Sequence, residues 1–212
     1  MPPKNYWSIL LFNLFYILPF TFYYLSRKNY EFLWYVSVLV FFYVLILATL
    51  PKSKFDGTIL WGLSLWGFLH MAGGGIRIGE NVLYDLVLFP VVLRGEITIL
   101  KFDQFVHFFG FAVTTLAGFH LLRPHLNQSV NWKVISFILV GFGMGMGALN
   151  EVVEFIAVTS FSQTGVGGYT NTALDLVFNL FGALAVVPWI RYKTFRRHGT
   201  CGTVLKPLAG GE

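Results

Sequence analysis

The stretch FLWYVSVLVFFYVLILATL, residues 32–50, decides the fold class of this chain. It contains nineteen consecutive residues without a charged side chain. An α-helix rises about 1.5 Å per residue, so a run of this length approaches the thickness of the hydrocarbon core of a bilayer, roughly 30 Å. Because backbone polar groups in lipid must be hydrogen-bonded within the protein, the stretch predicts a transmembrane helix.

The composition of the chain also indicates a membrane protein. Hydrophobic residues make up 56% of the 212 residues and charged residues 12%, about half the charged share of soluble domains. A soluble fold could not bury this much apolar surface, whereas lipid solvates it. The net charge of +5 comes mostly from loops and chain ends, which is a poor match to a nucleic-acid-binding face. The single cysteine, Cys201, excludes a disulfide framework.

Six apolar segments have the length, or nearly the length, of a transmembrane helix. We therefore predict an all-α fold, a polytopic transmembrane helix bundle of about six spans in a single domain. A basic, Gly-rich cytoplasmic tail at 191–212 would follow the last span. The third span is the shortest, at the lower limit for crossing. The predicted spans are residues 6–25, 32–50, 58–71, 102–122, 134–159 and 173–190.

Residues 72–101 separate the third span from the fourth. Their apolar run, 82–93, is interrupted by Asp85 and Pro90 and is too short to cross the bilayer. We expect a short re-entrant or interfacial segment that packs on the bundle.

The distribution of Lys and Arg predicts the orientation of the bundle. With six spans, ten of these residues fall on the side of the two termini and five on the other side. We therefore expect a multi-pass protein of the cell membrane with both termini in the cytoplasm. The five basic residues on the predicted outer side are Arg27, Lys28, Arg77, Arg94 and Lys101.

Several ionisable side chains interrupt the predicted spans, which costs roughly 2.5–3.5 kcal/mol each in a bilayer. When the spans alternate in direction, all of them fall in the outer half of the membrane. Within a span they occur in pairs three or four residues apart, so each pair shares one helix face. These polar residues are His70 in the third span, Asp103 and His107 in the fourth, Glu151 and Glu154 in the fifth, and Asp175 and Asn179 in the sixth.

Glycines continue two of these helix faces. Gly143 and Gly147 precede Glu151 at steps of four, and Gly182 follows Asn179 at a step of three. Small residues let membrane helices approach closely, so we expect these faces to pack against each other.

Other glycines suggest further features. A second register, Gly141 with Gly145, lies in the fifth span, and we predict from the two registers that this span is the central helix. The glycines of 73–75 and 165–168 lack the strand and the Lys-Ser/Thr ending of a phosphate-binding loop. We interpret them as outer turns that close over the polar site.

The polar residues of the outer half predict a metal site. Histidine and carboxylates from several helices bind Zn, Fe or Mn ions in helix bundles. A divalent metal would offset the repulsion between neighbouring carboxylates and could activate water against a lipid-linked or envelope molecule. The candidate catalytic residues are Glu151, Glu154 and His107. The candidate metal ligands are His107, Glu151, Glu154 and Asp175, with Asp103 and His70 as ligands or supporting residues.

Two other functions fit the same residues. A small proton- or cation-coupled transporter would use carboxylates that share protons, with His107 as a relay. A structural membrane protein would use the polar residues only to join helices, through hydrogen bonds worth roughly 0.6–2 kcal/mol each. Four acids are a costly way to join helices, which favours a functional site. Enzyme, transporter and structural protein stay open at this point, as does the oligomeric state.

The order of these motifs resembles that of the YjdF-like family of bacterial inner-membrane proteins. Residues 102–187 are also similar to the VanZ-like membrane proteins. The first resemblance implies no settled activity, and the second implies an envelope role, because VanZ-like proteins are linked to resistance toward a lipoglycopeptide antibiotic. Glu154 stands where the VanZ-like pattern has Gln. The motifs are His70-Met71-Ala72-Gly73-Gly74, Asp103-x-x-x-His107, Glu151-x-x-Glu154, and Asp175-x-x-x-Asn179 with Gly182.

Overall fold

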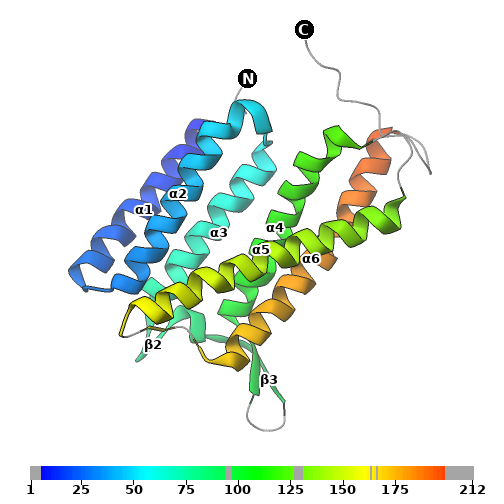
Figure 1. The fold of residues 1–212 in the computed structure, drawn as a ribbon. Coiled ribbons are helices and arrows are strands. Elements are labelled where there is room, and N and C mark those ends of the chain that lie inside the picture. Colours follow the sequence, from blue (N-terminus) through cyan, green and yellow to red (C-terminus); the bar gives the residue numbers. More distant parts are fainter. Residues whose placement is uncertain (1–5, 94–96, 127–130, 163, 166, 199–212) are drawn as a thin grey trace.

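A computed structural model describes residues 6–93, 97–126, 131–162, 164–165 and 167–198. Its α-helices run up and down in one bundle, with two β-hairpins at one end (Figure 1). The prediction of an all-α polytopic bundle is confirmed. The helices are α1 (Tyr6–Ser26), α2 (Tyr30–Ser53), α3 (Gly57–Gly75), α4 (Phe102–Leu122), α5 (Trp132–Ser160) and α6 (Tyr169–His198).

The two ends of the bundle differ. At the end that we call the hairpin end, α1, α3 and α5 finish and α2, α4 and α6 begin (Figure 1). At the opposite end, the termini end, α1 begins and α6 finishes. Among the described residues, α1, α2, α4, α5 and α6 are long and apolar enough to cross a membrane. The shorter α3 packs between α1 and α4.

Side-chain caps define where α2 and α3 begin. The Asn29 side chain accepts a hydrogen bond from the backbone N–H of Phe32, and Asp56 accepts one from that of Ile59. Such caps satisfy N–H groups that have no partner within the first helical turn. They place short turns between α1 and α2 and between α2 and α3, so these helices are antiparallel neighbours.

The glycines of 73–75 lie inside α3, so the predicted turn is wrong at this position. A β-carbon on Gly73 would meet the ring of Tyr84, and one on Gly74 would meet the ring of Phe32. Two aromatic rings therefore pack directly on the helix backbone. The glycines serve close approach here and do not bend the chain.

The segment between α3 and α4 contains strands, which the sequence patterns did not predict. The pairs β1–β2 and β3–β4 are both antiparallel, and Gly79, with a φ of 63°, lies in the first turn. The Val- and Ile-rich composition favours extended backbone over helix. The short η1 helix between the hairpins packs on α3 and α4. The elements are β1 (Arg77–Ile78), β2 (Asn81–Val82), η1 (Leu83–Asp85), β3 (Val87–Leu93) and β4 (Ile97–Lys101).

The central helix is α4, so the prediction that the fifth span is central is wrong. In their most apolar windows, 44% of α4 is buried inside the protein and 22% of α5. In α5, Gly143 packs against Thr115 and Ala183, whereas Gly141 and Gly145 face open space. One of the two glycine registers is therefore used for packing. The other belongs to the outward face of α5, which crosses the bundle at a slant (Figure 1).

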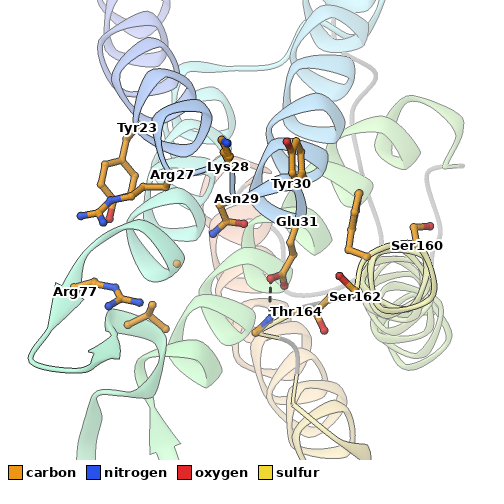
Figure 2. A pocket seen from close by; sticks show the side chains of 14 residues that line it. Tyr23, Arg27, Lys28, Asn29, Tyr30, Glu31, Arg77, Ser160, Ser162 and Thr164 are labelled. Carbon is orange, nitrogen blue, oxygen red and sulfur yellow. Dashed lines mark hydrogen bonds between the residues drawn. The ribbon is translucent and has the colours of Figure 1, made fainter.

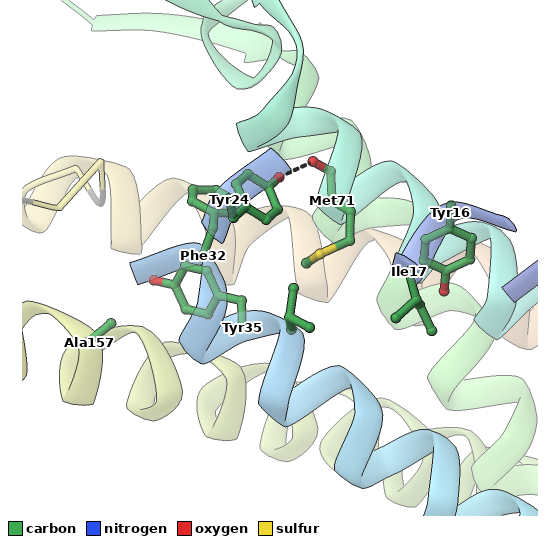
Figure 3. Packing of buried hydrophobic residues seen from close by; sticks show 8 residues of the cluster. Tyr16, Ile17, Tyr24, Phe32, Tyr35, Met71 and Ala157 are labelled. Carbon is green, nitrogen blue, oxygen red and sulfur yellow. Dashed lines mark hydrogen bonds between the residues drawn. The ribbon is translucent and has the colours of Figure 1, made fainter. Parts of the chain in front are cut away.

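Two apolar clusters hold the bundle around its centre. Near the hairpin end, Tyr24, Phe32, Tyr35 and Met71 join α1, α2 and α3, and the Tyr24 hydroxyl donates to the Met71 carbonyl at 2.5 Å (Figure 3). Ala157 brings α5 into the same cluster. A second cluster fills the space between α4, α5 and α6 toward the termini end. Its buried members are Phe119, Ile135, Leu139, Val187 and Ile190.

The last helix is longer than the predicted sixth span. It continues from Tyr169 to His198, so the first residues of the predicted tail are helical. The ammonium of Lys193 lies 4.3 Å from the ring centroid of Trp189, one turn earlier, and this cation–π contact stabilises the extension. The remainder of the predicted tail, 199–212, lies outside the described residues.

Candidate metal centre

Three helices bring polar side chains together around His107 of α4, whose exposed fraction is 5%. The convergence of acids and histidine predicted from the sequence is therefore present. We call this set the His107 cluster. It consists of Asp103 and His107 from α4, Glu151 and Glu154 from α5, and Asp175 from α6.

The two ring nitrogens of His107 have different surroundings. Nδ1 lies 3.0 Å from Oδ1 of Asn179, an oxygen that can only accept, so Nδ1 carries the proton and donates it. In the neutral ring, the lone pair is then on Nε2. Nε2 lies 3.8 Å from Asp103 Oδ1 and 3.9 Å from Glu154 Oε1. Glu151 Oε1 is 3.8 Å from Nδ1. Nε2 therefore faces two carboxylates.

Two asparagines that were not among the predicted site residues orient the acids. Asn171 donates through Nδ2 to Asp175 Oδ2 at 2.7 Å and to Asp103 Oδ2 at 3.3 Å, which links α6 to α4. Asn150 donates through Nδ2 to Glu154 Oε1 at 3.0 Å. Each asparagine precedes its acid by four residues on the same helix. This spacing is a sequence signal that is compatible with a hydrogen bond between each pair.

Several polar atoms of the cluster are buried without a hydrogen-bond partner among the described residues. They include both carboxylate oxygens of Glu151 and Oδ1 of Asp175, and the Asp175 side chain has an exposed fraction of 0%. A buried carboxylate oxygen without a donor is costly unless it carries a proton or binds a cation. The cluster therefore has unused capacity to bind a positive charge.

Close helix contacts hold the cluster in place. A β-carbon on Gly147 would meet the amide of Asn179, and one on Gly182 would meet the backbone carbonyl of Phe108. Helices α5 and α4 therefore approach α6 at glycines, as expected from the sequence. These contacts place Asn179 against both His107 and the α5 backbone.

His70 is outside the two groups of close metal-binding atoms described below. The hydroxyl of Tyr84 donates to the His70 carbonyl at 2.9 Å and lies 2.5 Å from Nδ1 of the His70 ring. The rings of His70 and Tyr35 are in edge contact, with centroids 5.4 Å apart. We call Tyr35, His70 and Tyr84 the aromatic layer. Burial and the nearby carboxylates of Asp103 and Glu154 raise the pKa of the Tyr84 hydroxyl well above its usual value of 10, so Tyr84 remains a donor.

Two sets of three side chains could each hold a metal ion. One set is Asp103, His107 and Asp175, and the other is His107, Glu151 and Glu154; within a set, the ligand atoms lie within 4.8 Å of one another. Around a tetrahedral ion with bonds of about 2.1 Å, ligand atoms are roughly 3.4 Å apart. His107 belongs to both sets.

Comparison with known proteins gives one match. A family model described as "Predicted membrane protein (DUF2238)" matches residues 8–195, from the first turn of α1 to near the end of α6. No curated protein and no solved structure matches the chain.

Proposed function

We propose that this chain, which belongs to the DUF2238 family of predicted membrane proteins, binds a divalent metal ion at the His107 cluster and uses it on a lipid-linked or envelope molecule. One observation carries the proposal: among the described residues, Glu151 and Asp175 have buried carboxylate oxygens without hydrogen-bond donors, beside a histidine whose Nε2 faces two more carboxylates. A divalent ion would bind these oxygens and offset their mutual repulsion.

The geometry supports Nε2 of His107 as the nitrogen ligand. Its nearest carboxylate oxygens belong to Asp103 and Glu154, and Glu151 and Asp175 could complete the coordination. Asn179 accepts the other ring N–H, as a hydrogen-bond partner of a metal-bound histidine usually does. A mixed set of imidazole and carboxylates suits Zn, Fe or Mn.

The chemistry of such a site is activation of water. A bound divalent ion lowers the pKa of its water and polarises the bond to be broken. The carboxylate of Glu151, whose oxygens have no donor among the described residues, would serve as the proton acceptor of the site where it does not bind the ion. The cluster lies toward the hairpin end, where a lipid-linked molecule would meet the bundle near the membrane surface, and we assign this end to the outer leaflet.

Binding or catalysis is favoured over transport by the packing below the cluster. Toward the termini end, the apolar side chains of Phe119, Leu139 and Ile190 fill the space between α4, α5 and α6. A proton or cation leaving the cluster would have to cross this layer. The resemblances to YjdF-like and VanZ-like proteins remain predictions, of which the second agrees with an envelope role.

Elemental analysis of the protein purified in detergent tests the proposal. The variants are His107→Ala and Glu151→Ala, and the matched control is His120→Ala, because His120 lies on the same helix and bonds to the Ser53 carbonyl. We expect stoichiometric metal in the wild type and the control, and loss of metal in the two site variants.

Other outcomes would reject the metal site. Wild-type protein that holds no metal after purification without chelators, and takes up none from added Zn or Mn salts, would contradict it. Proton-dependent uptake by such metal-free protein in liposomes would support the transporter instead. Variants that only lose stability would support helix packing as the role of the acids.

A further inference from the structure

A second polar region lies beside the His107 cluster at the hairpin end. It is a cleft of about 840 Å³ between the α1–α2 turn, the end of α3 and the end of α5. Arg27 and Arg77 lie on one side of it, and Ser162 and Thr164 lie across from them (Figure 2). Lys28 adds a third basic side chain to the lining. These side chains are hydrogen-bond donors, and three of them are cations.

The one carboxylate among the described lining residues is buried and hydrogen-bonded within the protein. Glu31 has an exposed fraction of 6%. Its Oε2 accepts a hydrogen bond from the backbone N–H of Gly165 at 2.8 Å, and its Oε1 accepts one from the Tyr35 hydroxyl at 3.4 Å. Among the described residues, Arg27, Lys28 and Arg77 form no ion pair with a carboxylate. The cleft therefore presents net positive charge to a ligand.

The position of the cleft corresponds to the membrane surface. Arg27 and Lys28 lie between two candidate membrane spans, directly after α1 and before α2, and Arg77 follows α3 by two residues. A helix of 21 residues such as α1 is about 30 Å long and spans the hydrocarbon core. The basic side chains at its end therefore lie at the depth of lipid headgroups.

These residues also depart from the rule that basic residues collect on the cytoplasmic side. Of the five basic residues predicted on the outer side, three line this single cleft. A shared ligand gives a physical reason for basic residues at a place where orientation alone disfavours them.

The aromatic layer contacts the cleft through Glu31. Glu31 in the cleft bonds to Tyr35, whose ring contacts His70, and His70 bonds to Tyr84. The cleft is thus joined to His70 of α3 through contacts between side chains.

We infer that this cleft binds the phosphate group of an anionic molecule, with Arg27, Lys28 and Arg77 as the recognition residues. Arginine forms paired hydrogen bonds with phosphate oxygens, and serine and threonine hydroxyls add further donors. The inference rests on the proposed function only for the idea that the ligand is lipid-linked. The phosphate itself could belong to a lipid headgroup or to a soluble phosphate, and the experiment distinguishes the two.

The experiment measures binding by the full chain in phosphate-free detergent. The probes are radiolabelled inorganic phosphate and a fluorescent phosphatidylglycerol. The variant is Arg27→Gln with Arg77→Gln; Lys28 is left unchanged because its backbone φ of 53° means that a substitution could alter the turn. The matched control is Lys52→Gln with Lys133→Gln, which removes two exposed charges at the termini end.

We expect the double arginine variant to bind at least tenfold more weakly than wild type, and the control to bind normally. Binding of phosphatidylglycerol without inorganic phosphate identifies a lipid headgroup as the ligand, and the reverse identifies a soluble phosphate. Wild type that binds neither probe, or a control that loses binding equally, overturns the inference. Metal content separates this result from the metal proposal: the arginine variant should keep wild-type metal, and His107→Ala should keep phosphate binding.

Discussion

Asn179 offers a sensitive test of the metal centre, because it contacts the histidine and would not itself bind the metal. Its Oδ1 accepts the Nδ1 proton of His107 at 3.0 Å, and its exposed fraction is 0%. Asn179→Ala removes the acceptor that fixes the ring and its proton. Loss of such a partner lowers metal affinity about 10- to 100-fold, equivalent to roughly 1.4–2.7 kcal/mol. The cost of leaving a buried N–H unpaired, about 1–3 kcal/mol, has the same size.

Competition for Zn between the purified protein and a chromophoric chelator measures this affinity. The matched control is Asn13→Ala, since Asn13 is also buried and bonds to Ser64 Oγ at 2.7 Å, away from the cluster. Asn179→Asp keeps an acceptor and should retain affinity within about tenfold of wild type. An unchanged Zn affinity in Asn179→Ala, or an equal loss in Asn13→Ala, would refute the role assigned to His107 Nε2.

Two further predictions concern the packing that supports the site. Gly182→Ala places a methyl group against the Phe108 carbonyl, so we expect the free energy of unfolding to fall by about 1–3 kcal/mol, measured as a lower thermal unfolding midpoint in detergent. Gly141→Ala, where space is open, should leave the midpoint unchanged, and equal effects of the two substitutions would contradict the packing. Tyr84→Phe removes both hydrogen bonds to His70 and should lower the free energy of unfolding by about 1–3 kcal/mol. An unchanged thermal unfolding midpoint would show that the hydroxyl is not a structural donor.

The span pattern and the cluster were predictable because both depend on local spacing. Asp103 and His107 share a face of one helix, and alternating span directions bring that face to the same end as Glu151 and Asp175. No long-range contact had to be known. The lipid environment requires every crossing segment to be a helix, which leaves few possible arrangements.

The orientation of side chains within the site was less predictable. Asn150 and Asn171 have the spacing of hydrogen-bonding neighbours, but the spacing alone does not indicate a role. Tyr84 reaches His70 from η1, because a glycine of α3 leaves room for its ring. Such a contact depends on how two segments pack in the tertiary structure, and no periodic pattern in the sequence predicts it.

The basic residues of the cleft bear on the orientation of the whole chain. The positive-inside rule assumes that the location of each Lys and Arg in a loop is determined only by membrane insertion. If Arg27, Lys28 and Arg77 are held at the hairpin end by a phosphate ligand, they no longer count against an outer location for that end. Of the remaining predicted outer residues, Lys101 pairs with Asp85 at 3.3 Å, and Arg94 lies outside the described residues. A phosphate ligand in the cleft would therefore remove one objection to cytoplasmic termini. Labelling of single cysteines from either side of intact cells would test the orientation and the outer-leaflet substrate together. A hairpin end accessible only from the cytoplasm would exclude an outer-leaflet substrate but would leave the proposals for the cleft and the metal centre unaffected.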